Sequence, residues 1–368
     1  MICFNLISSF AMKVPRNIEE ARIEIDKIDS QLLSLLNNRM EIVKAIGDLK
    51  RTSKGAIYRP DREQAIIQRL SDLNAGRLNK KAIEAIFLEI FAVSRNIELA
   101  EKVAYLGPEG SFTHQAAESR FGAISEYMPL KSIKSVFEAV STGRVRFGVI
   151  PVENNQEGIV SDTIKLLNSL DVNIVAELPM PIHFTFGSKL EDLKSIKRIY
   201  SKDIAFKQCS KFLEEYFEHD MELIPVDSTS RAAQLAMESD ESAAVCSPIA
   251  AKMYQLPVLF ENIEDSADNF TRFLFISDDF KNNKSGNDKT SILVKLSGQP
   301  GSLVNFLQKF YDANINLNKI ESYPAKSGKG FNYQFLLEFD GHFEDENVKE
   351  LITDNESIKW LGSYPKLC

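Results

Sequence analysis

Residues 37–50 read NNRMEIVKAIGDLK and decide the fold of the first part of the chain. On a helical wheel of about 100° per residue, Ile42 and Ile46 lie on one apolar stripe. Arg39 and Lys50 lie on the same stripe, where an unpaired charge is costly to bury. The stretch therefore predicts an amphipathic helix whose two cations either reach water or neighbouring carboxylates, or bind an anionic ligand.

The surrounding residues, 17–102, have apolar positions at helical spacing and little glycine, which predicts an all-helical domain. We expect helices over 18–50, 61–73 and 80–102. The first would be about 50 Å long, which is too long for a compact unit of this size. Its length indicates that it packs against a partner.

Polar side chains also face the interior on the other two predicted helices. They are Glu63 on the second helix and Ser94 and Glu98 on the third. Arg22 lies roughly 25 Å before Arg39 along the first helix, so it cannot reach the same cluster within one chain. If Arg22 serves such a site, the site belongs to another subunit.

Composition limits the possible functions. A chain of 368 residues predicts two or three domains, and a net charge of −8 excludes broad attraction to nucleic acid or anionic membranes. The four cysteines are far apart and match neither a disulfide framework nor a zinc site. We expect a cytoplasmic protein without a metal or an organic cofactor.

The rest of the chain divides into three parts, behind an N-terminal tail over 1–16. Short apolar strands alternate with helices over 103–277, which predicts an α/β domain with mostly parallel sheets. A polar linker over 278–289 follows. Residues 290–368 have the βαββαβ order of a ferredoxin-like α+β domain.

Candidate ligand-binding residues of the α/β domain lie near predicted strand ends. Glu153 and Asn154 follow one strand, and Thr271 begins another. Loops beyond the carboxyl ends of strands form the usual ligand crevice of open α/β sheets. The four histidines match no catalytic or metal-binding spacing, and only His114, beside a strand-to-helix loop, is a functional candidate.

The segments ARIEIDKIDSQLLSLLNNRMEIVKAIGDLK, PDRE and SRNIE resemble the all-helical chorismate mutase domain, in its fusion with prephenate dehydratase. The resemblance implies that Lys50 donates to the ether oxygen of chorismate. Glu98 stands where some relatives have glutamine, and it donates there only when protonated, so we expect faster catalysis at mildly acidic pH. The implied binding residues are Arg22 of the partner chain, Arg39, Lys50, Arg62, Glu63, Ser94 and Glu98.

The segments YLGPEGSFTH, GVIPVENNQEGIV, YSKDIAFKQCSKFL and DNFTRFLFIS resemble prephenate dehydratase. The resemblance implies two α/β lobes with prephenate in the cleft between them. It makes Thr271 the essential hydroxyl and leaves Arg272 a structural role. The other implied prephenate-binding residues are Glu153, Asn154, Ser201, Gln208, Phe270 and Phe273.

The last domain resembles the ACT regulatory domain, through GSLV and ESYP. This implies feedback inhibition by L-phenylalanine bound between subunits of a homodimer or tetramer, although Tyr323 replaces the usual arginine. The implied effector-binding residues are Gly301, Ser302, Leu303, Val304, Glu321 and Ser322.

The sequence thus predicts a bifunctional enzyme of phenylalanine biosynthesis that converts chorismate to prephenate and then to phenylpyruvate. Two alternatives remain open. One is a prephenate dehydratase whose helical domain only dimerises, and the other is an amino-acid-sensing binding protein. Incubation of the protein with chorismate separates the three.

Overall fold

The computed structural model describes residues 17–53, 60–98, 102–217, 221–297, 299–325, 332–353 and 357–366. They form two compact units. One unit contains the first helix with Ile97 and Glu98, and the other contains the remaining described residues. The predicted N-terminal tail lies outside the described residues.

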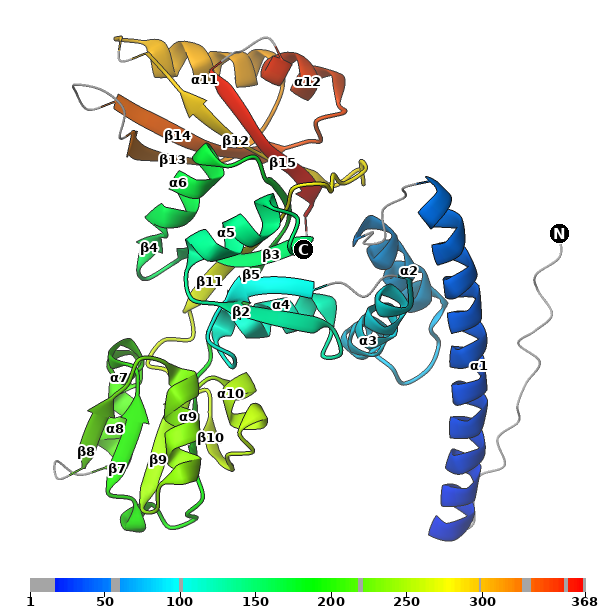
Figure 1. The fold of residues 1–368 in the computed structure, drawn as a ribbon, viewed down its shortest axis with the longest axis vertical. Helices are drawn as coiled ribbons and strands as arrows, with labels where there is room; N and C mark the ends of the chain where they lie inside the picture. The colour runs from blue at the N-terminus through cyan, green and yellow to red at the C-terminus, as the bar shows by residue number, and fades with distance from the viewer. Residues whose placement is uncertain are drawn as a thin grey trace. The chain divides into compact units, whose positions relative to one another are not determined.

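Three helices come first along the chain, α1 (Ile18–Ser53), α2 (Pro60–Leu73) and α3 (Lys80–Glu98) (Figure 1). The side chains of Asn17 and Asn79 cap α1 and α3, because each Oδ1 accepts a 2.8 Å hydrogen bond from a backbone N–H three residues later. The predicted helical region is confirmed, except that α3 is described only to Glu98, and Lys102, which was expected in this helix, begins a strand.

The apolar stripe of α1 is exposed within the described chain. Leu32, Leu35 and Ile42 keep 51%, 65% and 64% of their surface accessible. A stripe of this kind is normally buried against another element. The expectation that this helix packs against a partner stays a prediction.

The first α/β lobe is built on a mixed sheet with the order β2-β1-β3-β11-β5, and β4 pairs with β3. Its strands are β1 (Lys102–Leu106), β2 (Glu126–Leu130), β3 (Phe147–Asn154), β4 (Gly158–Ile159), β5 (Asn173–Pro181) and β11 (Phe270–Ser277). Its helices are α4 (Phe112–Phe121), α5 (Ile133–Ser141) and α6 (Ser161–Ser169).

The second lobe has a sheet with the order β10-β6-β9-β7-β8. Its strands are β6 (Thr185–Ser188), β7 (Arg198–Ser201), β8 (Glu222–Pro225), β9 (Ser242–Cys246) and β10 (Val258–Glu261). Its helical segments are η1 (Leu193–Ser195), α7 (Asp203–Gln208), α8 (Ser210–Tyr216), α9 (Thr229–Glu238) and α10 (Pro248–Met253).

One expectation for this domain was wrong, since both sheets are mixed rather than mostly parallel. In the first lobe, β11 returns from the second lobe and enters antiparallel between β3 and β5, and in the second lobe β6 is antiparallel to β9 and β10. Two helices, α7 and α8, follow Ser201. Asp265 caps the start of α8 by accepting hydrogen bonds from Ser210 Oγ and the Lys211 N–H, a tertiary contact that sequence spacing does not reveal.

The C-terminal residues have the predicted βαββαβ order, and the sheet order is β13-β14-β12-β15. The elements are β12 (Asp288–Lys295), α11 (Ser302–Asp312), β13 (Leu317–Ala325), β14 (Asn332–Asp340), α12 (Glu346–Thr353) and β15 (Ile358–Pro365).

Both faces of the C-terminal sheet are buried at its central strand, β12. Ile292 and Val294 pack with residues of α11 and α12, whereas Leu293 between them packs with residues of α5, α6 and β5. Successive residues of a strand point to opposite faces, so one strand contributes to both cores. The C-terminal sheet therefore packs against the first lobe.

The predicted linker forms hydrogen bonds with strands β5 and β15. Asn282 is 8% exposed, and its side-chain amide donates to the carbonyl oxygens of Val175 and Ser363 at 2.8 and 3.1 Å. Among the described residues, no helix is long and apolar enough to cross a membrane.

Candidate active sites

Thr271 is the second residue of β11 and lies where the chain re-enters the first lobe. In the sheet it stands opposite Asn154 of β3 on one side and Met180 of β5 on the other. Since Asn154 is the last residue of β3, the pair lies at an end of the sheet. Polar side chains at this place can reach a ligand without entering the core.

Asn154 fixes the surroundings of the Thr271 hydroxyl. Its Oδ1 accepts from the backbone N–H groups of Gln156 and Glu157 at 2.9 and 3.0 Å. These donors define which end of the amide is oxygen. The opposite end, Nδ2, therefore donates to Thr271 Oγ1 at 2.9 Å.

A chain of amides extends from this pair towards the second lobe. Asn154 Nδ2 also donates to Asn269 Oδ1 at 3.1 Å, and Asn269 Nδ2 donates to Gln208 Oε1 at 3.2 Å. Gln208 Nε2 then donates to Gln156 Oε1 at 3.0 Å. We call these four residues, with Thr271, the amide network.

Asn269 and Gln156 were not predicted as site residues from the sequence. Asn269 is 2% exposed and lies just before β11, so its side chain is part of the interior of the site. Its position two residues before Thr271 in DNFTRF was the available signal. A buried asparagine needs hydrogen-bond partners, and here both partners are predicted site residues.

The other predicted prephenate residues lie in different settings. Ser201 is fully buried, and its hydroxyl donates to the Val245 carbonyl at 2.7 Å. Phe270 is exposed, whereas Phe273 is buried in the core.

Glu153 points to the cations Lys319 and Arg272, at 2.5 and 3.1 Å from its Oε2. Burial alone would raise the pKa of the Glu153 carboxyl. The hydrogen bond from Lys319 and the charge of Arg272 outweigh burial and hold the pKa below its usual value.

His114 supports the loop before α4. Its Nδ1 accepts a 3.2 Å hydrogen bond from the Gly110 N–H, and its ring stacks on Tyr105 with centroids 4.7 Å apart. Burial lowers the pKa of His114 despite the carboxylates of Glu118 and Glu109. The neutral ring thus serves the loop as a structural acceptor.

The predicted chorismate residues belong to both compact units. Arg22 is exposed and lies 3.6 Å from Glu19, and Arg39 is half-buried. Glu98 lies against Gly47, where an added Cβ would approach the Glu98 Cα at 3.3 Å. The side chain of Lys50 lies outside the described residues.

In the other unit, Arg62 is exposed, and the Ser94 hydroxyl donates to the Ile90 carbonyl at 2.6 Å. Glu63 forms an ion pair with Arg95, a residue that the sequence analysis did not select. Arg95 is buried and also donates to the Phe121 carbonyl at 3.0 Å. Its position directly after Ser94 in SRNIE was the available signal.

The predicted effector residues lie in the C-terminal domain. Gly301 precedes α11 with a φ of +85°, which favours glycine, and the Ser302 hydroxyl donates to the Ser297 carbonyl at 2.7 Å. Val304 is exposed, and Glu321 and Ser322 lie on β13 at an edge of the sheet. Leu303 is half-buried.

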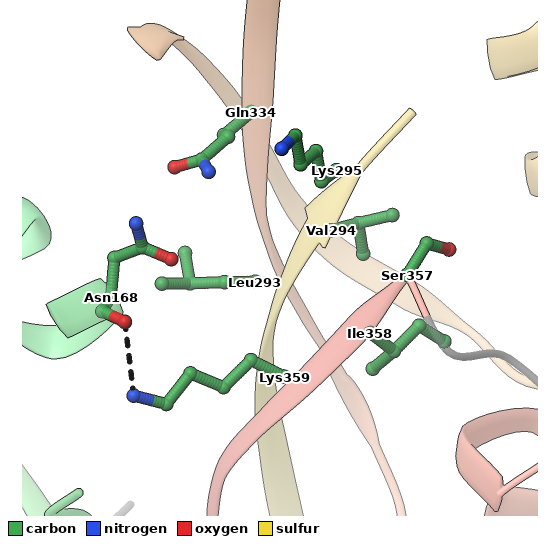
Figure 2. A pocket seen from close by; sticks show the side chains of 8 residues that line it. All are labelled: Asn168, Leu293, Val294, Lys295, Gln334, Ser357, Ile358 and Lys359. Carbon is green, nitrogen blue, oxygen red and sulfur yellow. Dashed lines mark hydrogen bonds between the residues drawn. The ribbon is translucent and has the colours of Figure 1, made fainter. Parts of the chain in front are cut away.

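A pocket of about 260 Å³ lies where the C-terminal sheet meets α6 (Figure 2). Lys359 Nζ donates to the Asn168 and Leu170 carbonyls at 3.1 and 2.7 Å, at the end of the helix. Cations stabilise this end of a helix. None of the residues that line the pocket is a predicted site residue, and its lysine is engaged with the protein itself.

Comparison with known proteins identifies both catalytic domains. A chorismate mutase type II model matches residues 21–99, and a prephenate dehydratase model matches residues 103–281. A solved prephenate dehydratase from Arthrobacter aurescens, in complex with L-Phe, is similar in structure, with a TM-score of 0.65 and 30% identity. The similarity covers 72% of this chain and 90% of that chain.

Two relatives are similar over almost their whole length, and both are described as bifunctional chorismate mutase/prephenate dehydratase. The protein of Aquifex aeolicus is 40% identical over 358 residues, which cover 95% of this chain and 98% of the relative. The protein of Pseudomonas aeruginosa is 35% identical over 359 residues, with the same coverage of both chains.

The matches include both domains. They therefore support an enzyme with two activities, rather than a dehydratase with a non-catalytic helical domain or an amino-acid-sensing binding protein. The chain belongs to the bifunctional chorismate mutase/prephenate dehydratase family, and it converts chorismate to prephenate and prephenate to phenylpyruvate.

Proposed function

We propose that Thr271 is the proton donor of the dehydratase reaction. Prephenate loses its ring carboxylate as CO2, and the electron pair of the broken bond makes the ring aromatic while the C4 hydroxyl leaves. The Thr271 proton converts the leaving hydroxyl to water, and solvent returns a proton to Thr271. The observation that carries this assignment is the Asn154 donor on Thr271 Oγ1, which leaves the threonine proton free to point to substrate.

The other members of the amide network hold the substrate and the donor in place. Gln208 connects the second lobe to Asn269, so prephenate held between the lobes would meet groups from both. Ser201, Phe270 and Phe273 are proposed to shape the same site, and Glu153 is proposed to support it through its ion pairs with Arg272 and Lys319. Fixed hydrogen-bond donors of this kind lower the barrier because they need no reorganisation during the reaction.

Thr271→Ala tests the assignment. The variant should lose phenylpyruvate formation and keep prephenate formation from chorismate, because the mutase residues are elsewhere in the chain. Ser277→Ala, which removes a buried hydroxyl at the other end of β11, is the matched control and should keep both activities. Phenylpyruvate formation by Thr271→Ala at the native rate would refute the assignment.

The mutase site is proposed to bind chorismate through cations and to need no proton transfer. Arg39 and Arg62 bind its carboxylates, Lys50 and protonated Glu98 donate to the ether oxygen, and Glu63 accepts from the ring hydroxyl. Ser94 orients a carboxylate. A concerted rearrangement needs a compact substrate conformer and positive charge near the breaking bond, and these groups supply both.

Arg22 is proposed to enter this site from a second copy of the chain. The exposed apolar stripe of α1 provides the surface for such a homodimer. Arg22→Ala and Arg39→Ala should each abolish mutase activity. Mixed and refolded together, they should regain part of it, because a heterodimer then has one intact site; no recovery would contradict the shared site.

The C-terminal domain is proposed to be an ACT domain that binds L-phenylalanine and inhibits the dehydratase. Its βαββαβ order and the L-Phe complex of the similar Arthrobacter aurescens enzyme support this proposal. The effector residues are Gly301, Ser302, Leu303, Val304, Glu321 and Ser322. Gly301→Ala should weaken inhibition, since alanine disfavours the φ of +85°. Titration of dehydratase activity with L-phenylalanine measures it.

A cytoplasmic location and assembly into tetramers stay predictions. Gel filtration with light scattering, with and without L-phenylalanine, would determine the mass of the assembly. A monomer under both conditions would contradict the proposed homodimer.

A further inference from the structure

Six charged side chains from two sheets meet behind the dehydratase site, and we call them the charge cluster. Three come from the first lobe and three from the C-terminal sheet, and their charges sum to zero. The members are Glu153, Glu177, Arg272, Lys289, Lys319 and Glu338.

Arg272 is the centre of the charge cluster. Its Nη1 donates to both carboxylate oxygens of Glu338, at 2.6 and 2.8 Å, and to Glu177 at 3.0 Å. Its Nη2 lies 3.1 Å from Glu153. The arginine on β11 is thus held by a carboxylate from the C-terminal strand β14 as well as by two from its own lobe.

The lysines complete the arrangement from the C-terminal side. Lys289 Nζ lies 2.5 Å from Glu177 and 3.6 Å from Glu338, and Lys319 Nζ lies 2.5 Å from Glu153. Each carboxylate therefore contacts Arg272 and one lysine. A buried ionic group that loses a partner is strongly destabilised, so the six side chains depend on one another.

The charge cluster and the amide network share a stretch of backbone. Arg272 directly follows Thr271, and Glu153 directly precedes Asn154; in the sheet Thr271 pairs with Asn154 and Arg272 with Glu153. Adjacent residues of a strand point to opposite faces. Thr271 and Asn154 thus face the proposed substrate site, and Arg272 and Glu153 face the C-terminal domain.

The two neighbours of β11 pair with it differently around Thr271. The register with β5 is regular from Phe270 to Phe275, whereas the register with β3 shifts between Arg272 and Phe273. Irregularities of this kind re-aim side chains and need other contacts to fix their geometry. The side-chain contacts of Arg272 supply such a restraint.

We propose that Arg272 and Glu338 are positioning residues for the dehydratase: the C-terminal domain supplies Glu338, which holds Arg272 and thereby aims the Thr271 hydroxyl. The inference rests on the assignment of Thr271 to the active site. The dehydratase site is then incomplete without the C-terminal domain, although that domain touches no substrate there.

Glu338→Gln tests the proposal in the full-length enzyme. It keeps the shape of the side chain, removes its charge and weakens the hold on Arg272. We expect kcat for prephenate to fall about tenfold, since small displacements of a reacting group have effects of this size or larger. KM should stay near the native value, because Glu338 contacts no substrate. Mutase activity should be unchanged.

Asp340→Asn is the matched control. It removes one negative charge from the same strand two residues away, where Asp340 pairs with Lys366 and not with the charge cluster. Its dehydratase kcat should equal the native value. Arg272→Lys keeps the positive charge but loses the forked guanidinium contacts, so it should lower kcat to a similar extent. It replaces Glu338→Gln as the test if that variant does not fold.

A double-mutant cycle separates positioning from a loss of folded enzyme. In a Thr271→Ser background, Glu338→Gln should lower kcat much less than it does alone, because both changes act on one hydroxyl. If Thr271→Ser and Glu338→Gln lower kcat by independent factors that multiply in the double variant, the proposal is overturned. It is also overturned if Glu338→Gln and Arg272→Lys both keep the native kcat. If Thr271→Ala stays active, the site assignment itself fails; if only the cluster variants stay active, this inference alone fails.

Discussion

The side-chain amide of Asn154 donates to Thr271 Oγ1 at 2.9 Å, and the opposite end of the same amide is held by two backbone N–H groups. The donor and acceptor ends of Asn154 are therefore not interchangeable. An aspartate at this position would keep the two backbone contacts and lose the donor.

Asn154→Asp is accordingly predicted to lower dehydratase kcat about 100-fold, as expected when a fixed donor is lost near a reacting group. The measurement is phenylpyruvate formation at saturating prephenate, with prephenate formation from chorismate as the internal control. Asn79→Asp, which keeps an N-cap acceptor on α3, should leave dehydratase activity unchanged. Equal kcat for Asn154→Asp and the native enzyme would show that the donor is not needed.

Asn269→Ser is predicted to reduce dehydratase kcat/KM about tenfold or more, because it breaks the connection between Asn154 and Gln208. Asn282→Ser is a matched control, since Asn282 is also a buried asparagine with two hydrogen bonds but lies in the linker. Both variants should lower the melting temperature. Only Asn269→Ser should lower kcat/KM, and similar kinetic losses in both would indicate a stability effect.

Glu98→Gln is predicted to change the pH dependence of the mutase. Glutamine donates a hydrogen bond at every pH, whereas a carboxyl group donates only in its protonated form. The native mutase rate should therefore be greater at mildly acidic pH, and the variant should give a flat profile. Identical pH profiles for the two proteins would count against a role for Glu98 at the ether oxygen.

His114 is predicted to make stability depend on pH. Burial lowers its pKa from the ordinary value of 6.5, so below that pH the unfolded chain takes up a proton that the folded protein does not. Stability then falls as the pH drops, by at most about 1.4 kcal/mol per pH unit from this group. His114→Asn should reduce this slope in denaturant unfolding below pH 6.5. An unchanged slope would assign the effect to other groups.

Sequence spacing could identify parts of the amide network but not its connections. Thr271 and Asn154 lie in motifs, yet they are neighbours only because β11 enters between β3 and β5. Asn269 has no periodicity to indicate it, since it lies in the segment where the chain returns from the second lobe. Asn269 matters because it donates to Gln208, which is the last residue of helix α7 in the second lobe.

Charge patterns were harder to interpret than apolar patterns. The helical wheel placed Arg39 on the apolar stripe of the first helix, and that stripe is present on α1. Arg272 was given only a structural role, because sequence spacing does not show that strands β12, β13 and β14 bring partners to it. Contacts between domains depend on tertiary placement, which local pattern does not encode.

The central strand of the C-terminal sheet is buried on both faces, and this affects how the proposed inhibition by L-phenylalanine should be removed. A protein shortened to end at Ser277 would uncover the apolar side chains of α6 and β5 that now pack against Leu293, Leu336 and Leu361. Newly exposed apolar surface of this kind promotes aggregation. The proposed inhibition by L-phenylalanine should therefore be removed by substituting a proposed effector residue such as Ser322, with the whole domain kept.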